Sequence, residues 1–343
     1  MTNGESGNAV LSFRRAADGS LAPLGATPTG GRGTGGTIDP LMSQYSVLLT
    51  SDHAFLFVVN AGSDDISSFK VASDGTIAFA NRVPSGGDQP VSLAVYSRIL
   101  YALNKGNNTV SGFWINADGT LQPIAGSTRQ LRSGAAGAST VAFTPDGLWL
   151  IVTEIMSNRL ETFPLRADGR LGDPRITMSS GAGPFGFAVT PRNQPIVTEV
   201  KGAAPNGAVS SYRVAANGVL GAVTASLSTQ QMATCWLVLT ADGRYAFTAN
   251  SASGSIAAFG VAENAALTLL DPRAGVSGPA GTMPPAAVPI DLDLSDGDRY
   301  LYVLEAGTGT IGTFAVGAGG TLGARADTPA GRPASGLQGL AAW

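Results

Sequence analysis

The fold follows from a stretch in the middle of the chain, Thr140-Val-Ala-Phe-Thr-Pro-Asp-Gly-Leu-Trp-Leu-Ile-Val-Thr-Glu154. Two short apolar runs flank a Pro-Asp-Gly turn, and a third run over residues 159–165 leads through Asp168-Gly169 to a fourth. Asp-Gly between apolar runs is a strong hairpin signal. The stretch therefore predicts four short antiparallel strands.

The turn before the fourth run recurs seven times along the chain. Its copies are Asp18-Gly19, Asp74-Gly75, Asp118-Gly119, Asp168-Gly169, Asn217-Gly218, Asn264-Ala265 and Gly319-Gly320. They lie 44 to 56 residues apart, and the two chain ends together supply a further interval of 42. A period of roughly 20 to 50 residues is typical of solenoids and propellers, and four strands make one propeller blade. The sequence predicts one all-β domain over residues 1–343, a seven-bladed β-propeller with four-stranded antiparallel blades.

The third strand of each unit carries an aromatic residue at one equivalent position: Phe13, Phe69, Phe113, Phe163, Tyr212, Phe259 and Phe314. Large flat side chains at a repeated position suit the packing of blade on blade, so we interpret them as core.

Both termini are expected to contribute to the last blade, because closing the ring removes exposed strand edges. Residues 337–343 would supply the inner strand, residues 8–14 the third strand, and residues 21–24 the start of the fourth. Residues 1–3 cover only the end of a second strand. We therefore expect the natural chain to begin earlier, and a removed upstream signal would make the protein secreted or periplasmic.

Composition excludes several classes of function. The net charge is −3 and only three residues are lysine, which provides no electrostatic footprint for nucleic acid or an anionic membrane. No apolar run reaches the roughly 18 residues of a membrane span. We expect a soluble monomer with a small-molecule substrate, no nucleic-acid partner and no membrane insertion.

Cysteine and histidine are too scarce for several kinds of catalysis. The one cysteine, Cys235, excludes an internal disulfide and a cysteine metal cluster. The one histidine, His53, falls in a turn on the face opposite the predicted mouth. This argues against a Ser-His-Asp mechanism and against a zinc site with several histidines.

The second strand of every unit ends in a polar residue: Asn3, Asn60, Asn104, Glu154, Glu199, Asn250 and Glu305. These strand ends point to one mouth of the central channel, which is the default ligand site. Asparagine there also suits a purely local role in the turn, whereas glutamate caps such turns less well.

Glu154 and Glu199 lie on neighbouring blades and are the catalytic candidates. Neighbouring carboxylates can take different pKa values and act as general base and acid. With Asn250 they could instead hold a cation such as calcium, although no cofactor or metal is expected. A turn or surface role stays open for each.

Other residues near the same mouth are candidates for substrate binding: Arg32, Gln44, Asn60, Asn104, Arg129, Arg132, Phe187, Trp236, Asn250, Asp291 and Glu305. Arg32 belongs to the glycine-rich stretch 29–37, and Arg129 and Arg132 belong to a second long connection. Arginine in such loops could bind an anionic ligand. Passive connection, aromatic packing and a solvated channel lining are the alternatives for the loops, the aromatic residues and Asp291.

The repeat contains Thr-Pro-Asp-Gly at 144–147, Arg-Tyr-Leu-Tyr-Val-Leu at 299–304 and Gly-Thr-Gly-Thr-Ile at 307–311. With these motifs the whole chain resembles the bacterial lactonase-family seven-bladed propellers. That family includes the propeller type of 6-phosphogluconolactonase and is related to the fungal carboxymuconate lactonizing enzyme. The same blade pattern recurs in surface-layer proteins with Tyr-Val-Thr-Asn repeats.

The resemblance implies an enzyme that opens or forms a lactone, or a related proton-transfer cyclase, acting on a lactone or a carboxylate. It implies mouth positions for Glu154 and Glu199, where relatives also bear glutamate, whereas Glu305 stands where asparagine is more usual. The family's enzymes are expected to use histidine and arginine at the mouth, and this chain has no histidine for that face. The second hypothesis is a non-catalytic binding propeller, extracellular or in the cell envelope, that presents its mouth to a peptide, glycan or cell-wall component.

Overall fold

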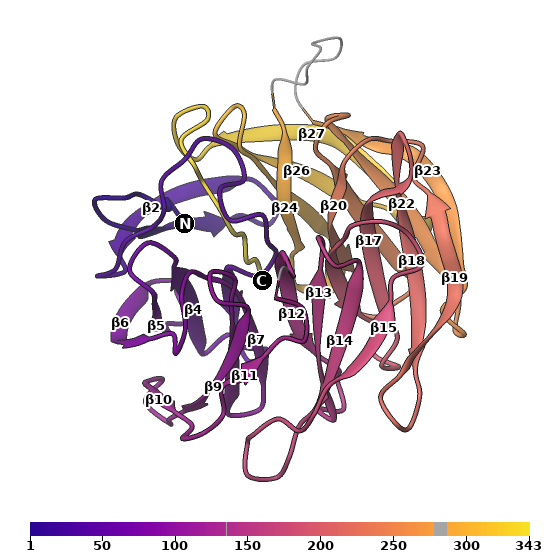
Figure 1. Ribbon diagram of the computed structural model, residues 1–343. Helices are drawn as coiled ribbons and strands as arrows, with labels where there is room; N and C mark the ends of the chain where they lie inside the picture. The colour runs from indigo at the N-terminus through magenta and orange to yellow at the C-terminus, as the bar shows by residue number, and fades with distance from the viewer. Residues whose placement is uncertain (135, 278–286) are drawn as a thin grey trace.

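The computed structural model describes residues 1–134, 136–277 and 287–343. In this part of the chain, six antiparallel sheets of four or more strands follow one another around a common centre (Figure 1). Their first strands contact each other from sheet to sheet, and the C-terminus lies near the centre. The fold is therefore an all-β propeller with four-stranded antiparallel blades.

The sheets, numbered 1 to 6 in chain order, each run from an inner to an outer strand. Sheet 1 consists of β3 (Val47–Leu49), β4 (Phe55–Asn60), β5 (Asp65–Val71) and β6 (Ile77–Pro84). Sheet 2 consists of β7 (Pro90–Tyr96), β8 (Ile99–Asn104), β9 (Thr109–Ile115) and β10 (Leu121–Pro123), with β11 (Arg129–Gln130) also paired to β9. Sheet 3 consists of β12 (Ala138–Phe143), β13 (Trp149–Glu154), β14 (Arg159–Pro164) and β15 (Arg175–Met178).

The second half of the ring repeats this order. Sheet 4 consists of β16 (Pro184–Val189), β17 (Pro195–Ala203), β18 (Asn206–Val214) and β19 (Leu220–Ser228). Sheet 5 consists of β20 (Thr234–Leu239), β21 (Tyr245–Asn250), β22 (Ser255–Val261) and β23 (Leu267–Val276). Sheet 6 consists of β24 (Pro289–Leu294), β25 (Tyr300–Glu305), β26 (Thr310–Val316) and β27 (Leu322–Pro329), and the 3₁₀ turns η1 (Asp296–Asp298) and η2 (Ala318–Gly320) join its strands.

A smaller sheet lies at the join between the two ends of the chain. It contains β1 (Ala9–Arg15) and β2 (Leu21–Pro28), and we call it the terminal sheet. The C-terminal residues 337–343 form no regular strand, although their expected position is confirmed by reciprocal bonds to the N-terminus. The Met1 nitrogen donates to the Gln338 carbonyl at 2.8 Å, and the Gln338 N–H donates to the Met1 carbonyl at 3.0 Å.

The predicted turns are confirmed. Gly19, Gly75, Gly119, Gly169 and Gly218 have φ between 79° and 86°, and Ala265 adopts 72°. In the first copy the Asp18 carboxylate accepts the N–H of Ser20 at 3.0 Å, and five further copies repeat this bond. A left-handed residue after an Asx turn is what a tight hairpin requires.

Six of the seven repeated aromatic residues are core, as predicted, with at most 2% of their surface exposed. Phe13 of the terminal sheet is the exception, since it is only partly buried. Its environment differs because its sheet has two strands instead of four.

A segment before β3 crosses the centre of the ring, and we call residues 41–45 the crossing segment. The Gln44 side chain donates to the Leu237 carbonyl in β20 at 2.7 Å, and the Tyr45 hydroxyl donates to the Phe187 carbonyl in β16 at 3.0 Å. Serines 43 and 139 bind it to β7 and β12. The sequence showed no sign of this crossing.

Two carboxylates join sheet 6 to the C-terminal residues. Asp291 accepts the Leu340 N–H at 3.0 Å, and Asp293 accepts the Ala342 N–H at 2.8 Å. Burial raises the pKa of Asp291 to about 8 and that of Asp293 to about 7. The aspartates therefore have a role in closing the ring, besides any role in lining the channel.

The aromatic position can be tested with a matched pair of substitutions. We expect Phe163→Ala to lower the free energy of unfolding by about 3–5 kcal/mol, because it leaves a cavity between blades. Phe13→Ala should cost clearly less, because Phe13 is partly exposed. Urea unfolding of both variants would measure this, and equal losses would contradict the difference in packing.

The closing carboxylates predict a dependence of stability on pH. A carboxyl with a raised pKa in the fold binds its proton more tightly there than in the unfolded chain, so it removes stability as pH rises from about 4 towards 8. We expect Asp293→Asn to gain about 3 kcal/mol of stability relative to the unaltered chain as pH rises from 5 to 8.

The Asp293→Asn variant must be compared with the unaltered chain at each pH. Burial also lowers the pKa of the Met1 amine to about 5, which raises stability as pH rises, and this effect is common to both proteins. Urea midpoints at the two pH values give the difference. A stability gap that is the same at pH 5 and pH 8 would show that Asp293 does not titrate as proposed.

Candidate active site at the propeller mouth

The repeated polar residues lie where the sequence predicts them, but all seven are fully buried. Five of them end a second strand, whereas Glu199 lies in the middle of β17, and each of the six has 0% of its surface exposed, as does Asn3. The side chains of Asn60, Glu199 and Glu305 bond within their own sheet and to the connection that arrives from the preceding sheet. Those of Asn104, Glu154 and Asn250 bond within their own sheet, and that of Asn3 bonds Thr34 and Gly35. The seven therefore form a structural ring, with no free surface at the mouth.

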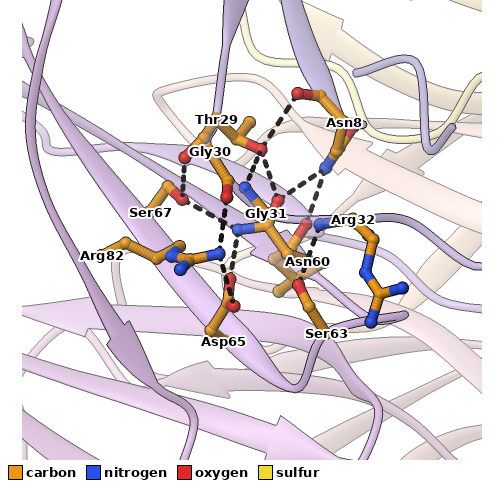
Figure 2. Close-up of polar contacts among 11 residues, drawn as sticks. Asn8, Thr29, Gly30, Gly31, Arg32, Asn60, Ser63, Asp65, Ser67 and Arg82 are labelled. Carbon is orange, nitrogen blue, oxygen red and sulfur yellow. Dashed lines mark hydrogen bonds and ion pairs between the residues drawn. The ribbon is translucent and has the colours of Figure 1, made fainter. Parts of the chain in front are cut away.

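Asn60 shows the pattern most completely (Figure 2). Its side-chain oxygen accepts bonds from Asn8 at 3.0 Å and Thr29 at 2.7 Å, and its nitrogen donates to Asp65 at 2.6 Å and Ser67 at 2.8 Å. The Asn60 amide can accept two hydrogen bonds and donate two, and these four contacts use all of them within the protein. This asparagine joins the terminal sheet to sheet 1.

The glycine-rich connection is packed against the same network. A Cβ atom on Gly31 would meet the Asn60 side chain, so this position requires glycine. The Arg82 guanidinium donates to the Gly30 carbonyl at 2.5 Å and pairs with Asp65 at 3.3 Å. Figure 2 shows the Arg32 side chain pointing away from these contacts, while its N–H bonds Ser63 at 2.8 Å. Arg32 is exposed and available to an anion.

Asn104, Asn250 and Glu305 follow the same local pattern. Asn104 donates to Thr109 at 3.3 Å, and Asn250 accepts from Thr234 at 2.7 Å. Glu305 accepts from Arg325 at 2.5 Å, and also from Ser277 and Thr310. Burial nevertheless raises the pKa of Glu305.

Glu199 is saturated with hydrogen bonds. One oxygen accepts from Ser210 at 2.6 Å, from the Gly181 N–H at 2.8 Å and from Ser179 at 3.3 Å, and the other accepts from Ser226 at 2.7 Å. A carboxylate with four donors around it is held as an acceptor.

Glu154 has a different environment, because it faces a second buried carboxyl group, Glu161 in β14. Glu154 accepts from Ser157, and Glu161 accepts the Arg132 N–H at 2.7 Å. Glu154 Oε1 and Glu161 Oε2 are buried without a partner among the described residues. Burial, and then the Glu154 carboxylate, raise the pKa of Glu161 to about 8. The two carboxyl groups are therefore suited to share one proton.

No hydrogen bond in the described structure joins Glu154 to Glu199. The sequence pointed to that pair, whereas the structure pairs Glu154 with Glu161. A signal existed, because the residue that bonds Asn60 and Asn104 from the third strand is a serine in each case, and Glu161 replaces it.

Some of the other predicted site residues are buried and make packing contacts, and others are exposed on the surface. Arg129 donates to the carbonyls of Leu171, Gly126 and Thr128, whereas the Arg132 side chain is exposed. Phe187 is fully buried, and Trp236 is buried beneath the crossing segment, where its indole N–H donates to the Ser43 carbonyl at 2.8 Å. Trp236 packs edge-on against Phe185, with ring centroids 5.0 Å apart.

A second acid site lies at the mouth itself, just before the crossing segment. Asp39 is partly exposed and accepts from Gln338 at 3.2 Å and from the Met42 N–H at 3.0 Å. Burial raises its pKa to about 7, and the nearby Lys105 opposes this rise. Lys105 donates to the Leu41 carbonyl at 3.1 Å, and burial lowers its pKa.

Lys105 could have been found from the sequence, since it directly follows Asn104 at a position where sheets 1, 3, 4, 5 and 6 carry Ala61, Ile155, Val200, Ser251 and Ala306. Asp39 could not, because its place depends on the crossing segment. Together they provide an acid that titrates near neutral pH and a cation beside it, which suits proton transfer with stabilisation of developing negative charge.

The described residues contain no group of three or more His, Cys, Asp or Glu side chains placed to hold a metal ion. They also contain no helix whose length and apolarity would let it cross a bilayer.

Solved structures with this fold include several enzymes. The periplasmic gluconolactonase of Pseudomonas aeruginosa superimposes with a TM-score of 0.71 at 20% identity, covering 95% of this chain and 97% of that one. A Bacteroides uniformis protein provisionally named a 6-phosphogluconolactonase gives 0.73 at 20% identity, covering 94% and 93%. Virginiamycin B lyase from Staphylococcus aureus gives 0.59 at 14% identity, covering 89% and 90%. At these identities the likeness concerns the fold.

The sequence itself defines the family. The model of the lactonase family, described as a 7-bladed β-propeller, matches residues 2–130 and 196–336, which is more than half of the chain. A search of curated proteins gave no match. The chain therefore belongs to the lactonase family of propellers.

The two glutamates should respond differently to the same substitution. We expect Glu199→Gln to lower the free energy of unfolding by about 1–3 kcal/mol, because an amide nitrogen would face donors that have lost their acceptor. Glu154→Gln should be neutral or stabilising, because it removes negative charge beside Glu161. Guanidinium unfolding at pH 7 measures both, and a large loss in Glu154→Gln would contradict the shared-proton arrangement.

Proposed function

We propose that the protein is a lactone hydrolase that works at the propeller mouth with Asp39 as general base. The observation that carries this proposal is the partly exposed Asp39 carboxyl, with a pKa of about 7, beside Lys105. A base is most effective when its pKa lies near the working pH. Membership of the lactonase family supplies the class of reaction.

In the proposed reaction, ionised Asp39 removes a proton from water, and the water oxygen attacks the lactone carbonyl. The Lys105 ammonium, which uses one of its three donors on Leu41, stabilises the oxyanion. Collapse breaks the ring C–O bond, and Asp39 returns its proton to the leaving alkoxide. The product is an open hydroxy acid, and the reverse sequence forms the lactone. Exposed Arg32 and Arg132 would hold a carboxylate or phosphate on the substrate.

Glu154 and Glu199 remain alternative bases. The Glu154 and Glu161 pair has the free oxygens that proton transfer needs, but both side chains are fully buried and no substrate reaches them in this structure. Glu199 has its acceptors occupied. The geometry therefore supports Asp39 first and Glu154 second.

We also propose that the terminal sheet and residues 1–3 and 337–343 together form a seventh blade. The family description and the bonds between Met1 and Gln338 support this count. The Pseudomonas gluconolactonase is periplasmic by name, and we propose the same location for this protein.

The activity can be tested with a pH-indicator screen over sugar, aliphatic and aromatic lactones. We expect the rate above background to rise with pH by about tenfold per unit below 7 and to level off above it, as Asp39 ionises. Asp39→Asn should lose at least about a hundredfold in kcat, and Lys105→Met should lose a similar factor. Circular dichroism would confirm that both variants fold.

Glu154→Gln and Glu199→Gln serve as matched controls, because each replaces a buried carboxyl group by an amide of similar shape and leaves Asp39 and Lys105 unaltered. If either of them, and not Asp39→Asn, abolishes turnover, then the base is that glutamate. If no lactone is hydrolysed by the unaltered chain, the enzyme proposal is wrong.

A specific observation favours the second function, a binding propeller without catalysis. All seven ring residues are fully buried, and the crossing segment covers Trp236 at the centre of the mouth. Such a mouth can present a surface without admitting substrate. Absence of turnover together with binding of a glycan or peptide at the mouth would favour this function.

A further inference from the structure

Exposed apolar side chains lie at the propeller mouth beside Asp39, and the proposed proton transfer does not use them. We call them the apolar strip and define it by four residues, Met42, Ile155, Met156 and Val200. Met42 and Met156 expose 46% and 76% of their surface, and the other two are half-buried. Apolar residues scattered singly over a surface are ordinary, whereas a group of them marks a place where apolar matter binds.

Backbone contacts place the strip next to Asp39. The Met42 N–H donates to the Asp39 carboxylate at 3.0 Å, and the Met42 carbonyl accepts the Ser139 hydroxyl of β12 at 3.1 Å. Two residues before Ser139, the Gly137 carbonyl accepts the Ile155 N–H at 3.1 Å. The strip therefore begins at Asp39 and passes over the start of β12 to the turn that follows β13.

Two glycines show that the strip is continuous. A Cβ atom on Gly137 would collide with the Met156 side chain, so this methionine lies across Gly137. A Cβ atom on Gly183 would lie 3.5 Å from the Val200 Cβ and 3.8 Å from the Ile155 Cγ2. Both aliphatic side chains consequently border the same glycine, and apolar surface extends from sheet 3 to sheet 4.

The two aliphatic residues of the strip rest on the hydrophobic core. Ile155 and Val200 pack against a buried cluster that includes Phe185 and Trp236. Each of the two directly follows a ring glutamate, at the position that carries Lys105 in sheet 2. The mouth is thus apolar over sheets 3 and 4 and carries a cation over sheet 2, with Asp39 next to both.

We propose that the substrate is a lactone bearing an aliphatic chain, with its ring at Asp39 and its chain along the apolar strip. This inference rests on the proposed lactone hydrolysis and narrows its substrate class. Complete burial of one methylene group favours binding by about fourfold, and methionine adapts its shape to such a chain. A sugar lactone would instead place hydroxyl groups against side chains that offer them no hydrogen bond.

The test compares γ-lactones that share one ring and differ in the group on the carbon that bears the ring oxygen: hydrogen, ethyl, butyl or hexyl. We expect kcat/KM to rise by about twofold per methylene group, because the strip covers the chain on one side only. Glucono-δ-lactone should have a kcat/KM at least about tenfold below that of the hexyl lactone. The pH-indicator assay measures each rate above background.

Two variants and a matched control locate the chain. Met156→Ser and Val200→Thr should each lower kcat/KM for the hexyl lactone by about three- to tenfold and leave that of the unsubstituted lactone within about twofold, because only the chain contacts the strip. Met178→Ser is the control, since Met178 is 57% exposed but belongs to the outer strand β15. It should leave both values unchanged. Met42 is kept, because its N–H bonds Asp39.

Non-hydrolysable γ-lactams separate this inference from the proposed function. We expect the lactam with a hexyl chain to bind in calorimetry at least about tenfold more tightly than the unsubstituted lactam, and Met156→Ser to remove most of this difference. If these binding results hold but no lactone is hydrolysed, the strip is a site for an aliphatic chain and the hydrolase proposal is wrong.

Three outcomes would overturn the chain proposal. Equal kcat/KM for all four γ-lactones, or a preference for glucono-δ-lactone, would leave a hydrolase without a chain site. Equal losses in Met156→Ser and Met178→Ser would show that the strip does not contact the chain. Absence of both hydrolysis and lactam binding would refute the chain site and the hydrolase together.

Discussion

The structure depends on closing a ring whose two ends are different pieces of chain. In sheets 1 to 6 each inner strand pairs with the second strand of its own hairpin. At the join, Leu340 and Ala342 instead donate their N–H groups to Asp291 and Asp293 of sheet 6. Charged carboxylates are costly to bury, and this cost is reflected in their raised pKa values. Closure therefore relies on these two carboxylates together with the backbone bonds between Met1 and Gln338.

The crossing segment is the second departure from the repeat, and it determines the mouth. Because Gln44 bonds β20 on the far side of the ring, the residues before it pass over the centre. This path brings Asp39 to Lys105 of sheet 2 and to Gln338 at the join. Among the residues described, Asp39 and Lys105 are therefore brought together by a segment that belongs to no blade.

Local features of the sequence predicted most of the fold. The Asp-Gly turns, the strands and the repeated aromatic residues recur in every unit, so each copy supports the others. The polar ring was also placed correctly, but its burial was not foreseen, because the bonds of Asn60 reach Asn8 and Thr29 in a different sheet. Glu161 was missed although the sequence carried a signal, because it stands where sheets 1 and 2 have Ser67 and Ser111.

In this repeat protein, the candidate functional residues are those that depart from the repeated pattern. A polar ring residue recurs in every unit, and the side chains of Asn60, Glu199 and Glu305 join their sheets to the connection from the sheet before. Asp39, Lys105 and the Glu154–Glu161 pair each break the pattern, and each carries a group whose protonation is sensitive to its surroundings. These sites differ from the framework in free energy, because an unpaired buried carboxyl oxygen lowers stability unless a ligand or a proton satisfies it.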